Sequence, residues 1–135
     1  MIVWTLLFLS SELYFLCQRL GIIDGWIYAL CRDSFECVHF YVLDPARRKW
    51  KKLPDLPYPC SKRYGMTCEV LGRKFYLLDG CGWTEDATNE IYHYDPLLNK
   101  WEKVSNMEIE RCHFVSGSIV GRLYAIGGIG SNSGV

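Results

Sequence analysis

One short motif recurs three times in this chain of 135 residues, and its spacing constrains the fold more than any other feature. Residues 72–80 read GRKFYLLDG, residues 121–128 read GRLYAIGG, and residues 25–30 read GWIYAL, a weaker copy. The tyrosines of the three copies are spaced 48 residues apart: Tyr28, Tyr76 and Tyr124. A fixed period of roughly 20–50 residues indicates a repeat architecture, in which each unit buries its apolar surface against its neighbours.

Two further landmarks keep the same register. An Asp-Pro pair is followed by tryptophan six residues after the aspartate, once as Asp44 with Trp50 and again as Asp95 with Trp101. An arginine stands 13 residues before the repeated tyrosine in two copies: Arg63 and Arg111. Three independent landmarks in one register indicate a true internal repeat.

The middle repeat contains the pattern of four strands. Residues 66–70 are β-prone, residues 75–78 are continuously apolar, residues 91–94 end at Asp-Pro, and residues 101–104 place apolar side chains around two charges. Proline cannot donate to a strand ladder and aspartate favours turns, so the third strand ends there. We therefore predict an all-β chain of four-stranded antiparallel sheets, which bury their two apolar faces against each other as propeller blades.

The order of these landmarks resembles the kelch repeat: arginine, then Gly-x-(x)-hydrophobic-Tyr, Gly-Gly, Tyr-x-x-Asp-Pro and tryptophan. Gly127-Gly128 matches the glycine pair in full, whereas Asp79-Gly80 matches it in part. The first copy has Cys31-Arg32 at this position, so we expect its chain to turn differently there. Residues 17–28 are also similar to the first kelch unit of plant-type F-box/kelch-repeat proteins.

The resemblance divides the chain into repeats at residues 16–62, 63–110 and 111–135, after an apolar segment at residues 1–15. Propellers contain about four to eight blades. We therefore expect an incomplete ring and a piece of a longer protein. The apolar segment is interpreted as a buried strand or a non-native start rather than a signal peptide, because no lysine or arginine precedes it.

Composition narrows the function. The 15 basic and 15 acidic side chains balance, which argues against a nucleic-acid binder, and the basic run at 47–52 is interpreted as a solvated turn and edge strand. Seven cysteines without a CxxC motif indicate reduced thiols, with no metal site and no cofactor. Neither a catalytic triad, a phosphate loop nor HExxH is present, so we predict no enzyme.

The resemblance implies a binding surface at the loops that join successive blades, around the mouth of the central channel. Arg63 and Arg111 lie there by sequence position, and Tyr64 and His113 are their neighbours. Guanidinium groups there would bind carboxylates of a protein partner. The alternative is that each arginine bonds loop carbonyls and stabilises a blade junction. The five repeated aromatic residues, Tyr28, Tyr76, Tyr124, Trp50 and Trp101, are expected to fill the space between sheets.

The resemblance further implies the substrate-recognition part of an F-box/kelch subunit of a cullin-type ubiquitin ligase. Its partners would be a protein substrate and, in a full-length parent with an F-box, the ligase adaptor. A cytoplasmic or nuclear location is expected, without membrane contact. Two alternatives stay open: a kelch scaffold or adaptor outside ubiquitination, and a kelch-type copper oxidase, which needs converging histidine and tyrosine ligands.

Overall fold

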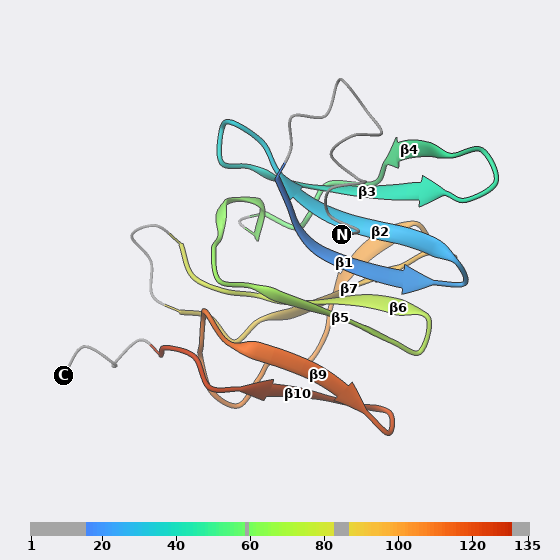
Figure 1. Ribbon diagram of the computed structural model, residues 1–135. Helices are drawn as coiled ribbons and strands as arrows, with labels where there is room; N and C mark the ends of the chain where they lie inside the picture. Colours follow the sequence, from blue (N-terminus) through green and yellow to red (C-terminus); the bar gives the residue numbers. More distant parts are fainter. Residues whose placement is uncertain (1–15, 59, 83–86, 131–135) are drawn as a thin grey trace.

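The described part of the chain folds into three antiparallel sheets that follow one another along the sequence (Figure 1). The computed structural model describes residues 16–58, 60–82 and 87–130. The apolar segment 1–15 therefore lies outside the described residues. In the ranges that are described, no helix is long and apolar enough to cross a membrane.

Two of the sheets have four strands and the third has two. The first contains β1 (Leu16–Ile23), β2 (Trp26–Arg32), β3 (Val38–Asp44) and β4 (Lys49–Lys52). The second contains β5 (Thr67–Leu71), β6 (Lys74–Leu78), β7 (Ile91–Asp95) and β8 (Lys100–Lys103), after a short 3-10 helix, η1 (Cys60–Lys62). The third pairs β9 (Val115–Ile119) with β10 (Arg122–Ile126). The predicted all-β fold with four-stranded antiparallel blades is confirmed.

The first hairpin of every sheet turns through two residues with positive φ. These are Asp24 and Gly25 (50° and 82°), Gly72 and Arg73 (56° and 60°), and Val120 and Gly121 (47° and 73°). Such turns match the right-handed twist of paired strands. The turns hold the 48-residue register, because the repeated tyrosines pair with Gly21, Glu69 and Gly117, which are also 48 residues apart.

The repeated aspartates shape the turn between the third and fourth strands. The Oδ1 atom of Asp44 accepts a hydrogen bond from the Ala46 amide at 2.9 Å, and Oδ1 of Asp95 accepts one from the Leu97 amide at 2.9 Å. An aspartate that bonds the backbone two residues later mimics a turn. The side chain therefore explains why aspartate recurs at this position.

Aromatic rings fill the space between the first two blades. Phe40 of β3 lies 5.1 Å from Phe75 of β6, and 5.0 Å from Tyr94 of β7, between ring centroids. Tyr28 of β2 lies 5.8 Å from Phe40 and 6.4 Å from Phe75. Ring pairs at 4.5–7 Å contribute about 0.5–1.5 kcal/mol beyond their buried area. The two sheets thus bury their facing sides against each other, as propeller blades do.

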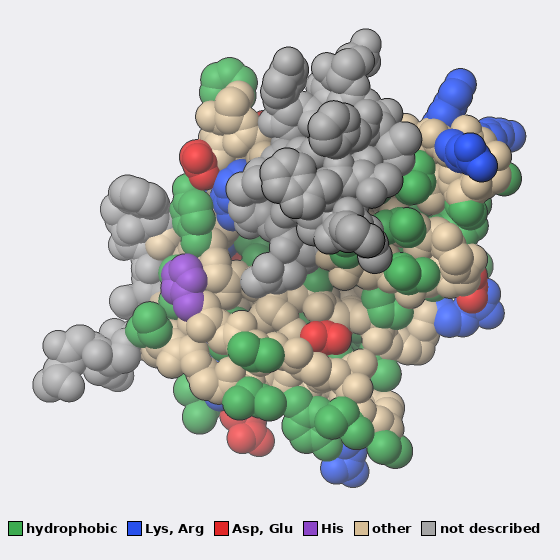
Figure 2. Space-filling view, viewed as in Figure 1, with side chains coloured by type: hydrophobic (Ala, Val, Ile, Leu, Met, Phe, Trp, Pro, Cys, Tyr) green, Lys and Arg blue, Asp and Glu red, His purple; other side chains and the backbone are tan. Residues whose placement is uncertain are grey.

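The three repeated tyrosines occupy one strand position but differ in burial. Tyr28 is 7% exposed because it faces the full second blade, whereas Tyr124 is 43% exposed. Tyr76 is half-buried and packs on His93 of its own sheet. For Tyr124 the expectation that the side chain fills the space between two sheets stays a prediction. No described sheet packs on its side of β10, and Figure 2 shows hydrophobic side chains gathered over this lower edge of the molecule.

The glycine pair serves two different physical needs. Gly127 and Gly128 both have positive φ, 74° and 91°, as expected from the Gly-Gly position. Gly80 does not, but a Cβ on Gly80 would lie 1.8 Å from the Tyr64 carbonyl oxygen. The strand that leads into β5 approaches here, with Tyr64 and Cys81 exchanging backbone hydrogen bonds of 2.8 and 2.9 Å. At position 80 glycine is required by close approach.

We expect Gly80→Ala to lower the free energy of unfolding by well over 1 kcal/mol, because the added methyl would displace the Tyr64 backbone. Chemical denaturation of the variant and the wild-type chain measures this. Gly117→Ala is the matched control, since a Cβ at Gly117 meets nothing within 4 Å. Equal stability of the two variants would contradict the close approach.

Candidate functional site

The longer connections, which join β2 to β3, β4 to β5, β6 to β7 and β8 to β9, gather at one end of the blades. We call this end the loop face. In Figure 1 it lies on the left, opposite the hairpin turns. Its described residues are 33–37, 60–66, 79–82, 87–90, 108–114 and 127–130. All four residues predicted to bind a partner lie here: Arg63, Tyr64, Arg111 and His113.

Arg63 is largely buried within the junction between the first two blades. Its residue is 8% exposed, and its Nη1 atom forms an ion pair with Asp79, which is fully buried. The same nitrogen lies 3.1 Å from Glu90 Oε2. Burial raises the pKa of Asp79, while the Arg63 guanidinium acts in the opposite direction. Arg63 therefore has the environment of a residue that stabilises the junction between two blades. This is the alternative to partner binding that its sequence position left open.

Further groups extend the network around Arg63. Burial alone would raise the pKa of Glu90, but hydrogen bonds from Lys103, Tyr92 and Arg63 hold it below its ordinary value. Lys103 Nζ and the Tyr92 hydroxyl each lie 3.0 Å from a Glu90 oxygen. The network thus joins the segment before β5 to β6, β7 and β8.

Arg111 occupies the same position one repeat later but bonds backbone instead of carboxylates. Its Nη1 atom donates to the Gly127 carbonyl at 2.9 Å and to the Ala125 carbonyl at 3.3 Å. Gly127 occupies the repeat position that Asp79 has in the second blade, so Arg111 has no carboxylate at this position to pair with. Arg111 is half-buried, and it closes the end of β10 against the segment before β9.

Tyr64 lies at the surface beside Arg32, a residue that sequence reasoning did not place in the site. The Arg32 guanidinium carbon lies 4.3 Å from the Tyr64 ring centroid, a cation–π contact. Arg32 Nη2 donates to the Arg63 carbonyl at 2.7 Å, and Nη1 donates to the Glu36 carbonyl at 2.8 Å. The available indication was the departure from Gly-Gly at Cys31-Arg32, which places an arginine where the other two repeats have Gly80 and Gly128.

Phe35 is another loop-face residue that the repeat pattern does not identify. It is 80% exposed in the connection between β2 and β3. Asp33 orders this loop by accepting hydrogen bonds from the Phe35 amide at 2.8 Å and the Cys37 amide at 2.9 Å. Phenylalanine is enriched in the cores of protein interfaces, so Phe35 is a candidate apolar contact for a partner.

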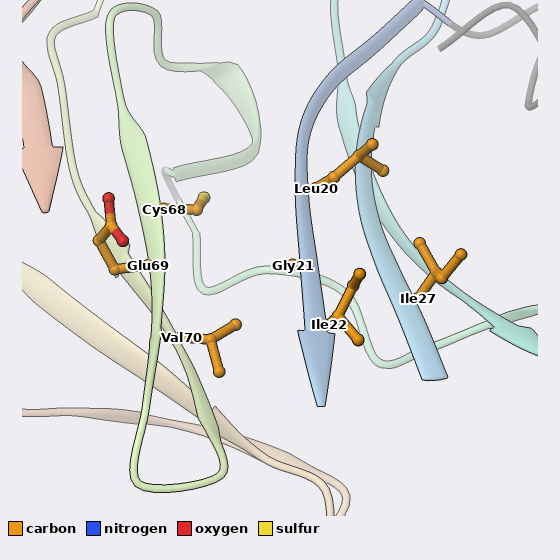
Figure 3. A pocket seen from close by; sticks show the side chains of 7 residues that line it. All are labelled: Leu20, Gly21, Ile22, Ile27, Cys68, Glu69 and Val70. Carbon is orange, nitrogen blue, oxygen red and sulfur yellow. The ribbon is translucent and has the colours of Figure 1, made fainter. Parts of the chain in front are cut away.

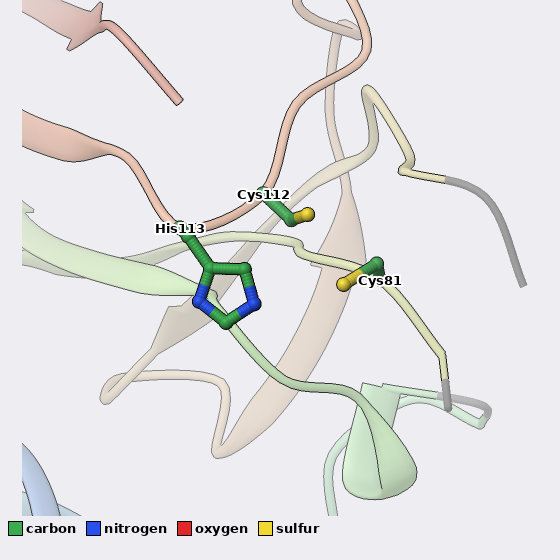
Figure 4. A group of neighbouring side chains, drawn as sticks. All are labelled: Cys81, Cys112 and His113. Atoms are coloured by element: carbon green, nitrogen blue, oxygen red, sulfur yellow. The ribbon is translucent and has the colours of Figure 1, made fainter. Parts of the chain in front are cut away.

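His113 is exposed and lies beside two cysteines (Figure 4). The Sγ atoms of Cys81 and Cys112 and a His113 ring nitrogen all lie within 4.8 Å of one another. Burial, together with a hydrogen bond to Cys81, raises the pKa of the Cys112 thiol to about 11. The six cysteines with described side chains form no disulfide: Cys31, Cys37, Cys60, Cys68, Cys81 and Cys112.

The other histidines lie elsewhere and each has a carboxylate neighbour. His39 Nε2 lies 2.7 Å from Asp33 Oδ2, and His93 Nε2 lies 3.2 Å from Glu102 Oε2. They sit on β3 and β7 of different blades. These described histidines therefore do not converge on one centre of the kind that a copper oxidase needs.

A shallow pocket separates the innermost strands β1 and β5 (Figure 3). Its volume is about 420 Å³, and its lining is mainly apolar, with Glu69 as the charged group. Glu69 accepts a hydrogen bond of 2.7 Å from the Ser116 hydroxyl on β9. This carboxylate is thus engaged in the contact between the second and third sheets.

Comparison with known proteins finds a known sequence motif in this chain. A sequence model described as Kelch motif matches residues 62–108. The second blade lies within the segment that is similar to this motif. The predicted resemblance to kelch propellers is therefore confirmed, and kelch repeats together with F-box/kelch relatives support a protein-interaction module.

The kelch relatives include F-box proteins of Arabidopsis thaliana. The F-box/kelch-repeat protein SKIP4 is 42% identical over 126 residues, covering 91% of this chain and 35% of the relative. The F-box/kelch-repeat protein SKIP11 is 27% identical over 114 residues, covering 82% of this chain and 22% of the relative. The chain thus spans about a third or less of the length of these relatives.

A solved structure shares the fold. YjhT superposes with a TM-score of 0.67 at 22% identity, over 84% of this chain and 34% of YjhT. At this identity the similarity concerns the fold alone.

Proposed function

We propose that this chain is the substrate-recognition part of an F-box/kelch subunit of a cullin-type ubiquitin ligase. The observation that carries the proposal is the 42% identity to SKIP4 over 126 residues. A kelch propeller supplies no catalytic group for this role, since its task is to hold a protein near the ligase. The described loop face supports the task, because it offers ordered loops with aromatic and polar side chains.

In this proposal the partner contacts Phe35, Tyr64 and His113. Phe35 and Tyr64 present aromatic side chains, which are enriched at the core of protein interfaces. Arg63 contributes by position rather than contact: it is buried, and its carbonyl holds Arg32 under the Tyr64 ring. Arg111 is half-buried and supports the His113 loop through its bonds to β10.

The test combines capture with protein lifetime. The wild-type chain is used as bait in lysate, and the captured proteins are compared with those whose half-lives lengthen when cullin activation is inhibited. We expect the two sets to overlap. Capture of proteins whose lifetimes do not change would instead support a kelch scaffold outside ubiquitination and contradict the ligase role.

A matched pair of variants tests the surface. Phe35→Ala with Tyr64→Ala should weaken capture by roughly tenfold or more, because hot-spot truncations cost about 2 kcal/mol. Leu97→Ala with Arg73→Ala changes two exposed residues at the opposite end and should leave capture intact. Equal capture by both double variants would remove the loop face from the proposal.

A further inference from the structure

Two cysteines and one histidine meet at the junction between the second and third sheets. Cys81 follows β6 of the second blade, whereas Cys112 and His113 precede β9 of the third sheet. Figure 4 shows both sulfur atoms and the imidazole ring turned toward one space. We propose that Cys81, Cys112 and His113 bind one zinc-class divalent cation and thereby tie the two sheets together.

The distances suit this coordination. In a tetrahedral zinc site, Zn–S bonds near 2.3 Å and Zn–N bonds near 2.0 Å place the ligand atoms roughly 3.6–3.8 Å apart. Here the three ligand atoms lie within 4.8 Å of one another before any ion is bound. Side-chain movements of about 1 Å would bring the three ligand atoms to these separations.

The backbone beneath the three ligands is held by hydrogen bonds on both sides. The Cys81 amide donates to the Tyr64 carbonyl at 2.9 Å, and Cys112 exchanges bonds of 3.0 and 2.9 Å with Ile129. The His113 amide donates to the Gly65 carbonyl at 2.9 Å. A site whose ligands are fixed in advance loses less entropy when the ion binds.

Gly65 creates the space for the histidine ring. It has a φ of 66°, and a Cβ there would lie 2.9 Å from both Cγ and Nδ1 of His113. The absence of a side chain at Gly65 therefore lets the imidazole lie close to the β5 segment and beside the thiols. His113 itself adopts a φ of 52°, which is uncommon for a non-glycine residue.

The donor set indicates the class of ion. Thiolate and imidazole ligands favour zinc and similar borderline ions over magnesium or calcium, which take oxygen ligands. Binding converts both thiols to thiolates and releases their two protons. Three protein ligands leave a fourth position, which opens to the loop face because His113 is exposed.

The test titrates Co²⁺ into the reduced, metal-free chain and follows the absorption spectrum. We expect one equivalent to bind with thiolate-to-cobalt charge-transfer bands, and Zn²⁺ to displace it. Cys81→Ser, Cys112→Ser and His113→Ala should each weaken binding by at least roughly tenfold. Cys37→Ser is the matched control, because this half-buried loop-face thiol lies outside the cluster.

Circular dichroism checks that each variant folds. If the buried Cys112→Ser variant fails to fold, Cys81→Ser and exposed His113→Ala decide the matter. The proposal would be overturned if the Cys37→Ser variant lost as much charge-transfer absorption as the Cys81→Ser variant. It would also be overturned if the fully reduced chain bound no Co²⁺. Cys81 and Cys112 would then be two thiols in contact without a metal-binding role.

Discussion

Replacing Arg63 with alanine is expected to lower the free energy of unfolding by about 3–5 kcal/mol, the range for breaking a buried ion pair from one side. The variant leaves the fully buried Asp79 carboxylate without its guanidinium partner. An uncompensated charge in that environment is far costlier than a lost surface contact. Chemical denaturation of wild type and variant measures the difference.

Two controls separate this effect from a general loss of charge. Arg73→Ala removes an exposed arginine that bonds Asp24 at 3.0 Å, and should change stability by less than about 1 kcal/mol. Arg63→Ala combined with Asp79→Ala should be less destabilised than the two single changes added together, because it leaves no unpaired Asp79 charge. A stable Arg63→Ala chain would mean that the guanidinium faces solvent and would restore Arg63 as a contact residue.

Replacing Trp101 with alanine should lower the free energy of unfolding by roughly 3 kcal/mol or more, as deletion of a large packed aromatic side chain does. Trp101 lies 4.9 Å from Phe40 of the first blade, between ring centroids, and 5.6 Å from Tyr94 of its own blade. Its Nε1 atom donates to the Pro54 carbonyl at 3.2 Å. The side chain therefore joins two blades, and its loss opens their interface.

Trp26→Ala provides the comparison, because Trp26 is exposed at the start of β2. This substitution should lower the free energy of unfolding by less than about 1 kcal/mol. Thermal unfolding of the two variants ranks them directly. Equal losses would show that Trp101 does not pack between the blades, and the blade register would then need revision.

The architecture could be predicted from sequence because its determinants are local and repeated. The 48-residue register of Tyr28, Tyr76 and Tyr124 survives in the hairpins, since each turn uses two residues with positive φ. Asp44 and Asp95 form the same side-chain turn in two blades. Such features depend on a few neighbouring residues, so a repeated sequence pattern is enough to predict them.

The environment of the candidate site could not be predicted in the same way. Arg63 and Arg111 are equivalent in sequence, yet Arg63 pairs with the buried carboxylate of Asp79, whereas Arg111 bonds backbone carbonyls. The difference depends on residues 16 positions downstream, aspartate in one repeat and glycine in the other. The two tryptophans differ likewise: Trp101 donates to Pro54, whereas Trp50 Nε1 is buried without a partner among the described residues.

The strands, their turns, the antiparallel order and the kelch register follow from the amino-acid sequence, because backbone preference and side-chain periodicity act over a few residues. Which side chains are buried, and which of them come together, depends instead on how the sheets pack in three dimensions. Tyr28 is buried and Tyr124 is exposed because one faces a complete blade and the other faces no described sheet. Cys81 approaches Cys112 and His113 because two blades meet there. Such contacts join residues that are far apart in the chain, and the number of residues between them does not predict their distance in space.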